Sequence, residues 1–365
     1  MSLLEVKNLS VQLLTLRGPA QAVRDVSFSL ARGDALGLIG ESGCGKSITA
    51  LSLMGLLPDN ATVSGSIRFD GQELVGASDD ALRELRGNRI GMIFQEPMTA
   101  LNPVHTIGHQ VAEPLRLHRR ASRDAARQQA IALLDRVGIA NAAGRFDAYP
   151  HQFSGGQRQR ITIAMALACG PDLLIADEPT TALDVTLQGQ ILDLISDLVQ
   201  ERGMALILIS HDLGVIAQNA ARMMVMYGGS VVESGPTRGV FAHMAHPYTR
   251  GLFGARPRVG ALRSARLTTI AGTVPELIDL PPGCPFSDRC TFAVAQCADH
   301  RPPITVIRHT SPARDAHLAS RGLSDAGDNH TASCFQLIEV AAAAAATDAL
   351  TASAAAAGTP AGQAA

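Results

Sequence analysis

The sequence predicts an α/β fold for residues 1–235, a smaller second domain over residues 236–340, and an alanine-rich tail over residues 341–365. Two observations predict the first domain: short apolar runs recur along it, and segments with polar or helical periodicity separate them. The third observation is a change of composition after residue 235, where prolines and clustered cysteines begin. A length of 365 residues also suits two domains.

Composition excludes several classes of protein. With 46% hydrophobic and 18% charged residues, the chain has enough apolar material for a packed core, which argues against global disorder. The 31 Lys and Arg residues against 33 Asp and Glu give a net charge of −2, so no basic excess points to nucleic acid or anionic lipid. No apolar stretch approaches the roughly 18 residues of a membrane-spanning helix, so we expect an intracellular, soluble or peripheral protein.

Five continuous apolar runs are expected to form parallel strands that are buried on both faces. They cover residues 35–39, 90–94, 173–176, 205–209 and 223–226. Earlier in the chain, Val26, Phe28 and Leu30 alternate with polar residues, as in a half-exposed antiparallel strand. The sheet system is therefore predicted to be mixed.

Two helical regions are predicted. Apolar residues from Leu187 to Leu198 recur on one helical face, and Gly203 is expected to end that helix. Residues 112–144 are also expected to be helical, with the polar run 116–129 facing solvent. The alternative for that run is a basic patch that binds nucleic acid.

A glycine-rich phosphate-binding loop directly follows the run 35–39. It matches the pattern G-x-x-x-x-G-K-[ST] and consists of Gly40, Glu41, Ser42, Gly43, Cys44, Gly45, Lys46 and Ser47. Backbone N–H groups of such a loop and of the following helix hold phosphate oxygens. Lys46 would reach the β and γ phosphates, and the Ser47 hydroxyl would bind Mg²⁺. The alternatives are a ligand-free turn and, for Cys44, a redox role.

Two acidic residues end the apolar run 173–176. An Asp at the end of a buried strand beside a phosphate-binding loop is expected to bind Mg²⁺ directly or through a water molecule, so Asp177 takes that role, and Glu178 can polarise an attacking water molecule. The alternative is that both acids belong to a solvated turn, which the phosphate-binding loop makes less attractive.

A serine and two glycines open a long apolar helix in the segment Phe153-Ser154-Gly155-Gly156-Gln157. With the two preceding motifs, this segment resembles the nucleotide-binding domain of ATP-binding cassette (ABC) transporters, whose LSGGQ signature here begins with Phe. The resemblance implies a P-loop NTPase fold with a mixed sheet core, an antiparallel β subdomain and a helical subdomain over about residues 96–170. It implies ATP as ligand, with the signature motif capping the γ phosphate held by an opposite subunit.

Further positions take their roles from this resemblance. Gln95 resembles the glutamine that senses Mg²⁺, and His211 resembles the histidine that contacts the γ phosphate. Ala182-Leu183-Asp184 resembles the loop that crosses between subunits. One departure is visible, because no aromatic residue precedes Phe28 to stack on adenine. Aliphatic residues between positions 11 and 23 are therefore expected to contact the base.

Residues 95–103, 246–249 and 272–298 resemble the ATP-binding subunits of oligopeptide and dipeptide importers. This implies a subunit at the cytoplasmic face of the inner membrane that powers peptide import. Its implied partners are a second ATP-binding subunit, two membrane permease subunits and an extracytoplasmic substrate-binding protein, with no nucleic acid. A heterodimer is favoured over a homodimer. The cargo stays open between a dipeptide, an oligopeptide, a glutathione-like peptide and a nickel chelate.

Two rival functions fit the sequence less well. A soluble ABC ATPase acting on nucleic acid or ribosomes usually carries tandem cassettes or a coiled-coil insertion, and this chain has neither. A regulatory module with an incidental ATPase would not need Lys46, Asp177, Glu178 and His211 all intact.

Four late cysteines follow the spacing C-x5-C-x6-C-x36-C. They are Cys284, Cys290, Cys297 and Cys334. Four thiolates suit tetrahedral zinc or an iron-sulfur cluster, but the common spacings of both are absent, and free or oxidised thiols also stay open. The family resemblance favours a structural [4Fe-4S] cluster, with zinc as the alternative.

Overall fold

The computed structural model describes residues 2–181, 183–255, 269–307 and 329–337. The chain divides into two compact units, Met1–Ser230 and Val231–Ala365.

A four-stranded antiparallel sheet forms one layer of the first unit. Its order is β2-β1-β4-β5, with β1 over Leu4–Thr15, β2 over Gly18–Leu30, β4 over Ala61–Phe69 and β5 over Gln72–Glu73. Leu4, Val6, Leu9 and Val11 of β1 are almost completely buried between exposed or half-buried neighbours. One face of this sheet therefore packs on the core, and the predicted antiparallel strand around Phe28 is confirmed as part of β2.

Five parallel strands form the core sheet of the first unit in the order β9-β3-β8-β7-β6. These are β3 (Ala35–Ile39), β6 (Ile90–Ile93), β7 (Leu173–Asp177), β8 (Ala205–Ile209) and β9 (Arg222–Tyr227). Every residue of β6, β7 and β8 is buried, so the predicted α/β fold with strands covered on both faces is confirmed. Phe94 lies just outside β6, and Asp177 lies inside β7.

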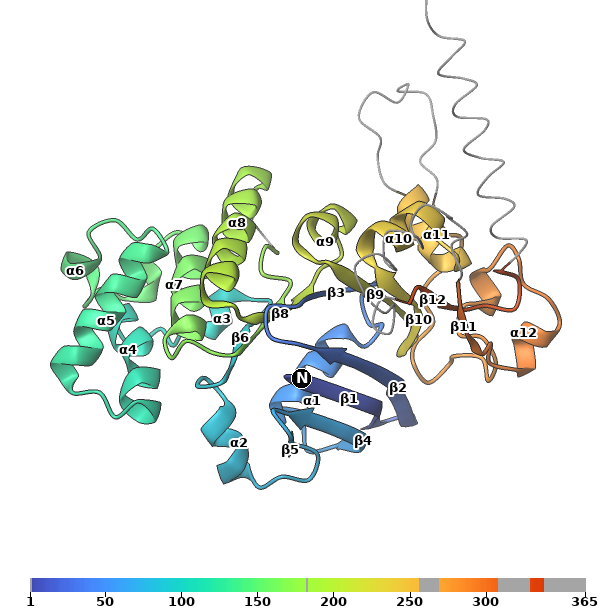
Figure 1. Cartoon of the computed structure of the whole chain (residues 1–365), viewed down its shortest axis with the longest axis horizontal. Helices are drawn as coiled ribbons and strands as arrows, with labels where there is room; N and C mark the ends of the chain where they lie inside the picture. Colours follow the sequence, from blue (N-terminus) through green and yellow to red (C-terminus); the bar gives the residue numbers. More distant parts are fainter. Residues whose placement is uncertain (1, 182, 256–268, 308–328, 338–365) are drawn as a thin grey trace, which may run out of the picture. The chain divides into compact units, whose positions relative to one another are not determined.

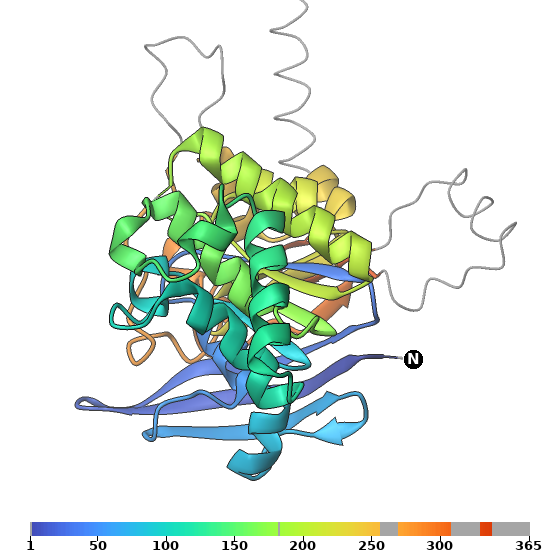
Figure 2. The same cartoon turned by 90° about the vertical axis from the view of Figure 1, so that its left-hand side faces the viewer.

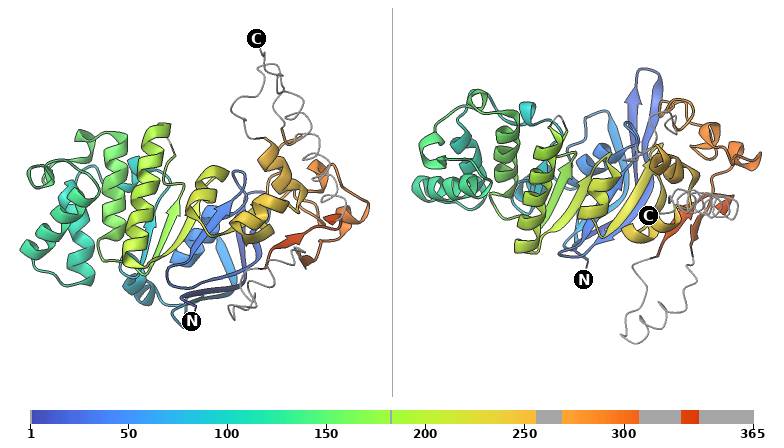
Figure 3. Two further views of the ribbon diagram at one scale, coloured as in Figure 1. Left: turned by 45° about the horizontal axis from the view of Figure 1, so that its top comes forward. Right: turned by 90° about the horizontal axis from the view of Figure 1, so that it is seen from above.

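Helices cover the core sheet. They include α1 (Lys46–Met54), α8 (Val185–Arg202) and α9 (Leu213–Asn219), whereas the short helix α2 (Asp79–Leu85) lies apart from the core sheet, near β5 (Figure 1). Figures 1 and 3 place α8 and α9 on one side of the core sheet and the antiparallel sheet on the other. Gly203 ends α8 in the left-handed conformation, with φ of 62°, as predicted.

The region expected to be helical over residues 112–144 is divided into several helices. They are α4 (Ile107–His118), α5 (Arg123–Arg136) and α6 (Ala142–Arg145), preceded by α3 (Pro97–Ala100) and followed by a 3-10 turn (Pro150–Gln152) and α7 (Gly155–Leu167). The break between α4 and α5 has a local cause. The Ser122 side chain accepts a hydrogen bond from the backbone N–H of Ala125 and thereby starts a new helix. Figure 2 shows this helical group facing the viewer.

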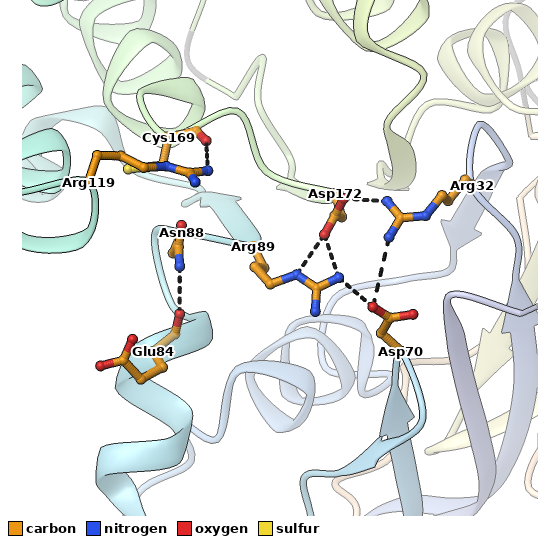
Figure 4. Close-up of polar contacts among 8 residues, drawn as sticks. All are labelled: Arg32, Asp70, Glu84, Asn88, Arg89, Arg119, Cys169 and Asp172. Atoms are coloured by element: carbon orange, nitrogen blue, oxygen red, sulfur yellow. Dashed lines mark hydrogen bonds and ion pairs between the residues drawn. The ribbon is translucent and has the colours of Figure 1, made fainter.

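Four charged side chains from separate loops of the first unit form an ion cluster, which Figure 4 shows. Arg89 precedes β6 and lies 2.7 Å from Asp172, which precedes β7, and 2.6 Å from Asp70, which lies between β4 and β5. Arg32, between β2 and β3, pairs with the same Asp172. We call these four residues the loop ion cluster. It ties the antiparallel sheet to the leading ends of the core strands.

The second unit is small and loop-rich. It contains β10 (Ser230–Pro236, all but its first residue), α10 (Thr237–His243), α11 (Pro247–Gly254), a 3-10 turn (Ser287–Arg289), α12 (Gln296–Asp299), β11 (Ile304–Val306) and β12 (Thr331–Ser333). The three strands described in this unit run antiparallel in the order β10-β12-β11. The predicted tail over residues 341–365 lies outside the described residues. Among the helices that are described, none has the length and apolarity needed to cross a bilayer.

Candidate nucleotide site

The phosphate-binding loop connects the end of β3 to the start of α1, as the motif predicts. Lys46 is 5% exposed, and its Nζ donates hydrogen bonds to the carbonyl oxygens of Gly40 at 2.8 Å and Glu41 at 3.1 Å. These bonds keep the ammonium group within the loop. A positive charge held there, beside backbone N–H groups at the start of α1, suits a bound phosphate.

Two glycines of this loop are required by close backbone approaches. A Cβ atom on Gly45, which has φ of 100°, would lie 2.6 Å from the carbonyl oxygen of Ala22 in β2. A Cβ atom on Gly40 would lie 2.3 Å from the carbonyl oxygen of Met226 in β9. Both contacts are shorter than real side chains allow, so only glycine fits at either position.

Cys44 is 1% exposed within the loop, with its Sγ 3.7 Å from the Nζ of Lys46. Burial raises the pKa of its thiol, although the charge and hydrogen bonds of Lys46 act in the opposite direction. A thiol with a raised pKa is a poor nucleophile at neutral pH. The geometry therefore favours packing over the redox alternative for Cys44.

Asp177 ends β7 beside the loop and is 4% exposed. Burial raises the pKa of this carboxyl group, the charge of Glu178 acts in the same direction, and a hydrogen bond from the Ser47 hydroxyl lowers it. Its Oδ1 has no hydrogen-bond partner among the residues that the structure describes. A buried carboxylate with a spare oxygen beside a serine hydroxyl is a donor set that fits Mg²⁺.

Glu178 occupies the centre of a polar cluster. Its Oε2 lies 3.3 Å from the Nε2 of Gln95, 3.3 Å from the Nδ1 of His211 and 3.0 Å from the hydroxyl of Thr181. Its φ of 45° places a non-glycine residue in the left-handed region, a strained conformation that is common at functional sites. The structure thus brings together the ends of β6, β7 and β8 around one carboxylate.

The signature segment forms the start of α7. Ser154 is the N-cap: its Oγ accepts the backbone N–H of Gln157, and its own N–H donates to the Gln157 side chain at 3.1 Å. Gly155 faces open space, whereas a Cβ atom on Gly156 would meet the Leu187 side chain at 2.2 Å. The exposed N–H groups at this helix start can hold an anion.

Not every predicted residue joins the Glu178 cluster. Asp184 is the N-cap of α8 and accepts the N–H of Leu187 at 2.9 Å. No hydrogen bond or ion pair between described side chains connects Asp184 or Ser154 to Glu178 or Lys46. Ala182 lies outside the described residues. Thr181, which bonds Glu178, was not predicted because a single hydroxyl three residues after an acid forms no recognisable motif.

The four late cysteines lie in the second unit, and none of them forms a disulfide bond within the described residues. Burial raises the pKa of Cys284 to about 11, and the charges of Cys297, Cys290 and Cys334 act in the same direction. Within the described residues, no three His, Cys, Asp or Glu side chains are arranged as a single metal ion requires. The predicted iron-sulfur cluster therefore has no direct structural support as a formed site.

Two family models match the chain. The ABC transporter model covers residues 23–181, and the model for the oligopeptide/dipeptide transporter C-terminal region covers residues 232–297. The dipeptide transport ATP-binding protein DppD of Bacillus subtilis is 49% identical over 329 residues, which span 90% of this chain and 96% of that protein.

Solved structures show the same relationship. The ATP-binding cassette MJ0796, in a dimeric post-hydrolysis state with ADP and phosphate, matches with a TM-score of 0.59 and 29% identity over 65% of this chain and 99% of that chain. The structure of cbiO1 from Clostridium perfringens, part of the transporter complex cbiONQ, matches with a TM-score of 0.56 and 28% identity over 67% of this chain and 92% of that chain. The chain belongs to the ATP-binding proteins of ABC transporters, within the group that carries the oligopeptide/dipeptide transporter C-terminal region.

Proposed function

We propose that this chain is the ATP-hydrolysing subunit of an ABC importer for di- or oligopeptides. The observation that carries the ATPase part is the convergence of Gln95, Thr181 and His211 on Oε2 of Glu178, beside the phosphate-binding loop. A carboxylate held by several polar groups at the end of a core strand is placed to orient a water molecule toward a γ phosphate.

Each residue of the site has a chemical task in this proposal. Lys46 and the backbone of residues 40–47 bind the β and γ phosphates, while Glu178 accepts a hydrogen bond from the attacking water. His211 and Gln95 border the water and the γ phosphate. Ser154, Gly155, Gly156 and Gln157, with Asp184, would face the nucleotide of a second subunit, so hydrolysis would require a dimer.

Magnesium fits the residues beside the loop. Ser47 and Asp177 would hold the ion, with Gln95 as a further ligand, because a hydroxyl and a buried carboxylate with a spare oxygen are suitable hard donors. When bound, Mg²⁺ offsets negative charge on the phosphates in the transition state. The residues of the chain itself supply binding and orientation.

The peptide part of the proposal is supported by the matched C-terminal region and by the name of the Bacillus subtilis relative. We infer partners of the corresponding kinds: a second ATP-binding subunit, with a heterodimer favoured, two membrane permease subunits and an extracytoplasmic substrate-binding protein. The chain would lie at the cytoplasmic face of the membrane. ATP-driven closure of the paired subunits would then move the permeases.

The variant Glu178→Gln tests the ATPase assignment. We expect kcat for ATP hydrolysis by the assembled complex to fall by about 10² to 10⁴-fold, since an amide cannot accept the proton of the attacking water. The dissociation constant for Mg²⁺-ATP should stay within about threefold of the value for the unaltered chain, because the substitution leaves the phosphate-binding loop unchanged. Phosphate release and calorimetric titration measure the two quantities.

Glu201→Gln is the matched control, because Glu201 is exposed at the surface and its carboxylate pairs with Arg136. It should leave hydrolysis unchanged. Retention of most hydrolysis in Glu178→Gln would remove Glu178 from the catalytic role. If no di- or oligopeptide stimulates hydrolysis when the binding protein is present, the assignment as an ATPase stands and the assignment of peptide as cargo is rejected.

The proposal also assigns a structural metal centre to the four cysteines, a [4Fe-4S] cluster with zinc as the alternative. Three of these sulfurs accept a hydrogen bond from the backbone N–H two residues later: Cys284 from Phe286, Cys290 from Phe292 at 3.4 Å, and Cys334 from Gln336 at 3.3 Å. Such bonds favour the thiolate, which is the form that binds metal, although burial outweighs them and raises the pKa of Cys284 and Cys290. Bound metal would supply folding stability to a loop-rich unit.

Elemental analysis tests the metal assignment. The full chain purified without oxygen should contain about four iron and four sulfide per chain. About one zinc and no sulfide would establish the zinc alternative. Neither metal in protein from metal-replete cells would overturn the assignment and leave the four residues as free thiols.

A further inference from the structure

Gln159 is a buried amide that stands out from the other polar side chains of α7. It lies in α7, is 1% exposed, and neither its Nε2 nor its Oε1 has a hydrogen-bond partner among the described residues. Burial of an unpaired donor and acceptor costs free energy that an apolar side chain of the same size would not cost. Such a residue requires an explanation other than packing in this conformation.

Its polar neighbours in α7 are paired. Gln157 caps the helix, Arg158 donates to the carbonyl oxygen of Pro150 at 2.8 Å, and Arg160 donates to that of Val137 at 2.8 Å. A second buried glutamine gives the contrast. Gln110 of α4 is 6% exposed, accepts the N–H of Asn102 at 2.8 Å, and donates to two carbonyl oxygens at 3.0 Å.

The position of Gln159 follows from the packing of α7. A Cβ atom on Gly91 of β6 would lie 2.5 Å from the carbonyl oxygen of Ala166, so the end of α7 lies against the start of β6. The helix runs antiparallel to β6, because the strand that follows it, β7, is parallel to β6. Gln159 lies seven residues before Ala166, a distance of about 10 Å along the helix axis. The same distance along β6 and its continuation is about three residues, from Gly91 to Phe94. Gln159 therefore lies level with Phe94 and Gln95.

A second contact supports this placement. Helix α3, which begins two residues after Gln95, packs against α7, as β6 itself does. The segment 94–96 thus leaves β6 next to the part of α7 that carries Gln159. Phe94 is 41% exposed, and this short segment lies outside both β6 and α3.

The other end of α7 is anchored. Arg119 donates to the carbonyl oxygen of Cys169 at 2.6 Å, shown in Figure 4, and Arg202 donates to that of Leu167 at 3.3 Å. These guanidinium groups hold the carbonyl oxygen of the last residue of α7 and that of Cys169, two residues beyond it. The contacts of Arg158 and Arg160 near the start of α7 are made with residues 150 and 137 of the same helical group.

We propose that Gln159 is a positioning residue whose amide binds the backbone of residues 94–96 when Mg²⁺-ATP is present. This inference rests on the proposed ATPase function. In that state the displacement of Gln95 toward Mg²⁺ brings backbone N–H and C=O groups to the amide of Gln159. The occupied nucleotide site is thereby connected to the helix that presents Ser154, Gly155 and Gly156 to a second subunit. The pairing that Gln159 lacks in this conformation is gained on binding.

Thermal unfolding of the full chain tests the first half of the proposal. Gln159→Met removes the unpaired polar atoms and keeps the volume, so the midpoint of the nucleotide-free chain should rise by about 2 to 4 °C. Gln110→Met is the matched control, since it removes three hydrogen bonds from an equally buried amide and should lower the midpoint. A lower midpoint for Gln159→Met as well would show that the amide is paired in the free chain, and would overturn the proposal.

Hydrogen exchange and kinetics test the second half. With Mg²⁺-ATP in the Glu178→Gln background, amides of residues 94–96 should gain protection, and Gln159→Met should abolish that gain. In the catalytically intact complex, Gln159→Met should lower kcat about tenfold and leave KM for ATP within about twofold. A merely structural role would not produce greater stability together with lower kcat.

Two results would overturn this half: unchanged protection of residues 94–96 in Gln159→Met, or an unchanged kcat. Failure of the proposed function is a separate result, because it would show as absent ATP binding and hydrolysis in the unaltered chain. The comparison of Gln159→Met with Gln110→Met in the absence of nucleotide would still be informative in that case.

Discussion

Among single residues, Arg89 connects parts of the first unit that are far apart in the sequence, and no local sequence pattern predicts these contacts. Its guanidinium binds Asp172 and Asp70 and lies over the ring of Phe69, 5.1 Å from the ring centroid. Burial raises the pKa of the Asp172 carboxyl, but hydrogen bonds and charge from Arg32 and Arg89 outweigh burial and hold it below the usual value. This carboxylate therefore contributes stability at neutral pH that is lost as pH falls through its lowered pKa.

Replacing Arg89 by Gln should lower the free energy of unfolding by about 1 kcal/mol, since the loop ion cluster loses its central cation. The groups are partly exposed, so the difference should shrink at 1 M salt. Urea unfolding at two salt concentrations measures both effects. Arg83→Gln is the control, because Arg83 is highly exposed and should change stability by less than about 0.5 kcal/mol. Equal losses in the two variants would contradict the assignment.

At the scale of elements, the start of α11 depends on one buried carboxylate. Glu233 of β10 accepts the backbone N–H of Ala245 at 2.8 Å and of His246 at 2.9 Å, and contacts Nε2 of His330 at 2.6 Å. His246 is the N-cap, with Nδ1 accepting the N–H of Tyr248 at 3.1 Å. Three segments distant in sequence thus meet at one side chain, and the helix can begin in a buried place because its first N–H groups are satisfied.

This arrangement predicts a pH dependence for the second unit. Burial lowers the pKa of His246 from 6.5 to about 4, although Glu233 acts in the opposite direction. Between these values the unfolded chain binds a proton that the folded chain does not, so stability falls as pH decreases from 6.5 to 4. Over this pH range, His246 alone lowers the free energy of unfolding by about 3 kcal/mol.

His246→Asn tests that prediction. The amide oxygen of Asn can accept the same N–H and cap α11, but it does not titrate. Unfolding of the second unit, followed by hydrogen exchange, should therefore depend less on pH in the variant. A residual slope is expected from His243, whose pKa is lowered by burial and by His330. An identical pH profile in both proteins would contradict the role of His246.

At the scale of the whole molecule, the parts predicted from sequence are those with a local signal. Continuous apolar runs identified the parallel strands, and the glycine-rich and acidic motifs identified Lys46, Asp177 and Glu178. Strand β1 was missed because register shifts at Val6, Leu9 and Val11 interrupt its alternation. The pairing of Arg32 with Asp172 spans 140 positions, and no periodicity carries information over that distance.

The division into two units predicts that a substitution in the second unit leaves ATP binding by the first unit unchanged. Cys290 lies in the second unit, whereas the phosphate-binding loop and Glu178 lie in the first. Cys290→Ser should remove most bound metal and lower the midpoint of the second unit, because the small loop-rich fold would lose the proposed metal centre. The dissociation constant for Mg²⁺-ATP should stay within about twofold. Cys169→Ser, at a buried thiol of the first unit, is the control and should keep the metal. Weakened ATP binding in Cys290→Ser with a folded first unit would show that the cysteines support the nucleotide site as well.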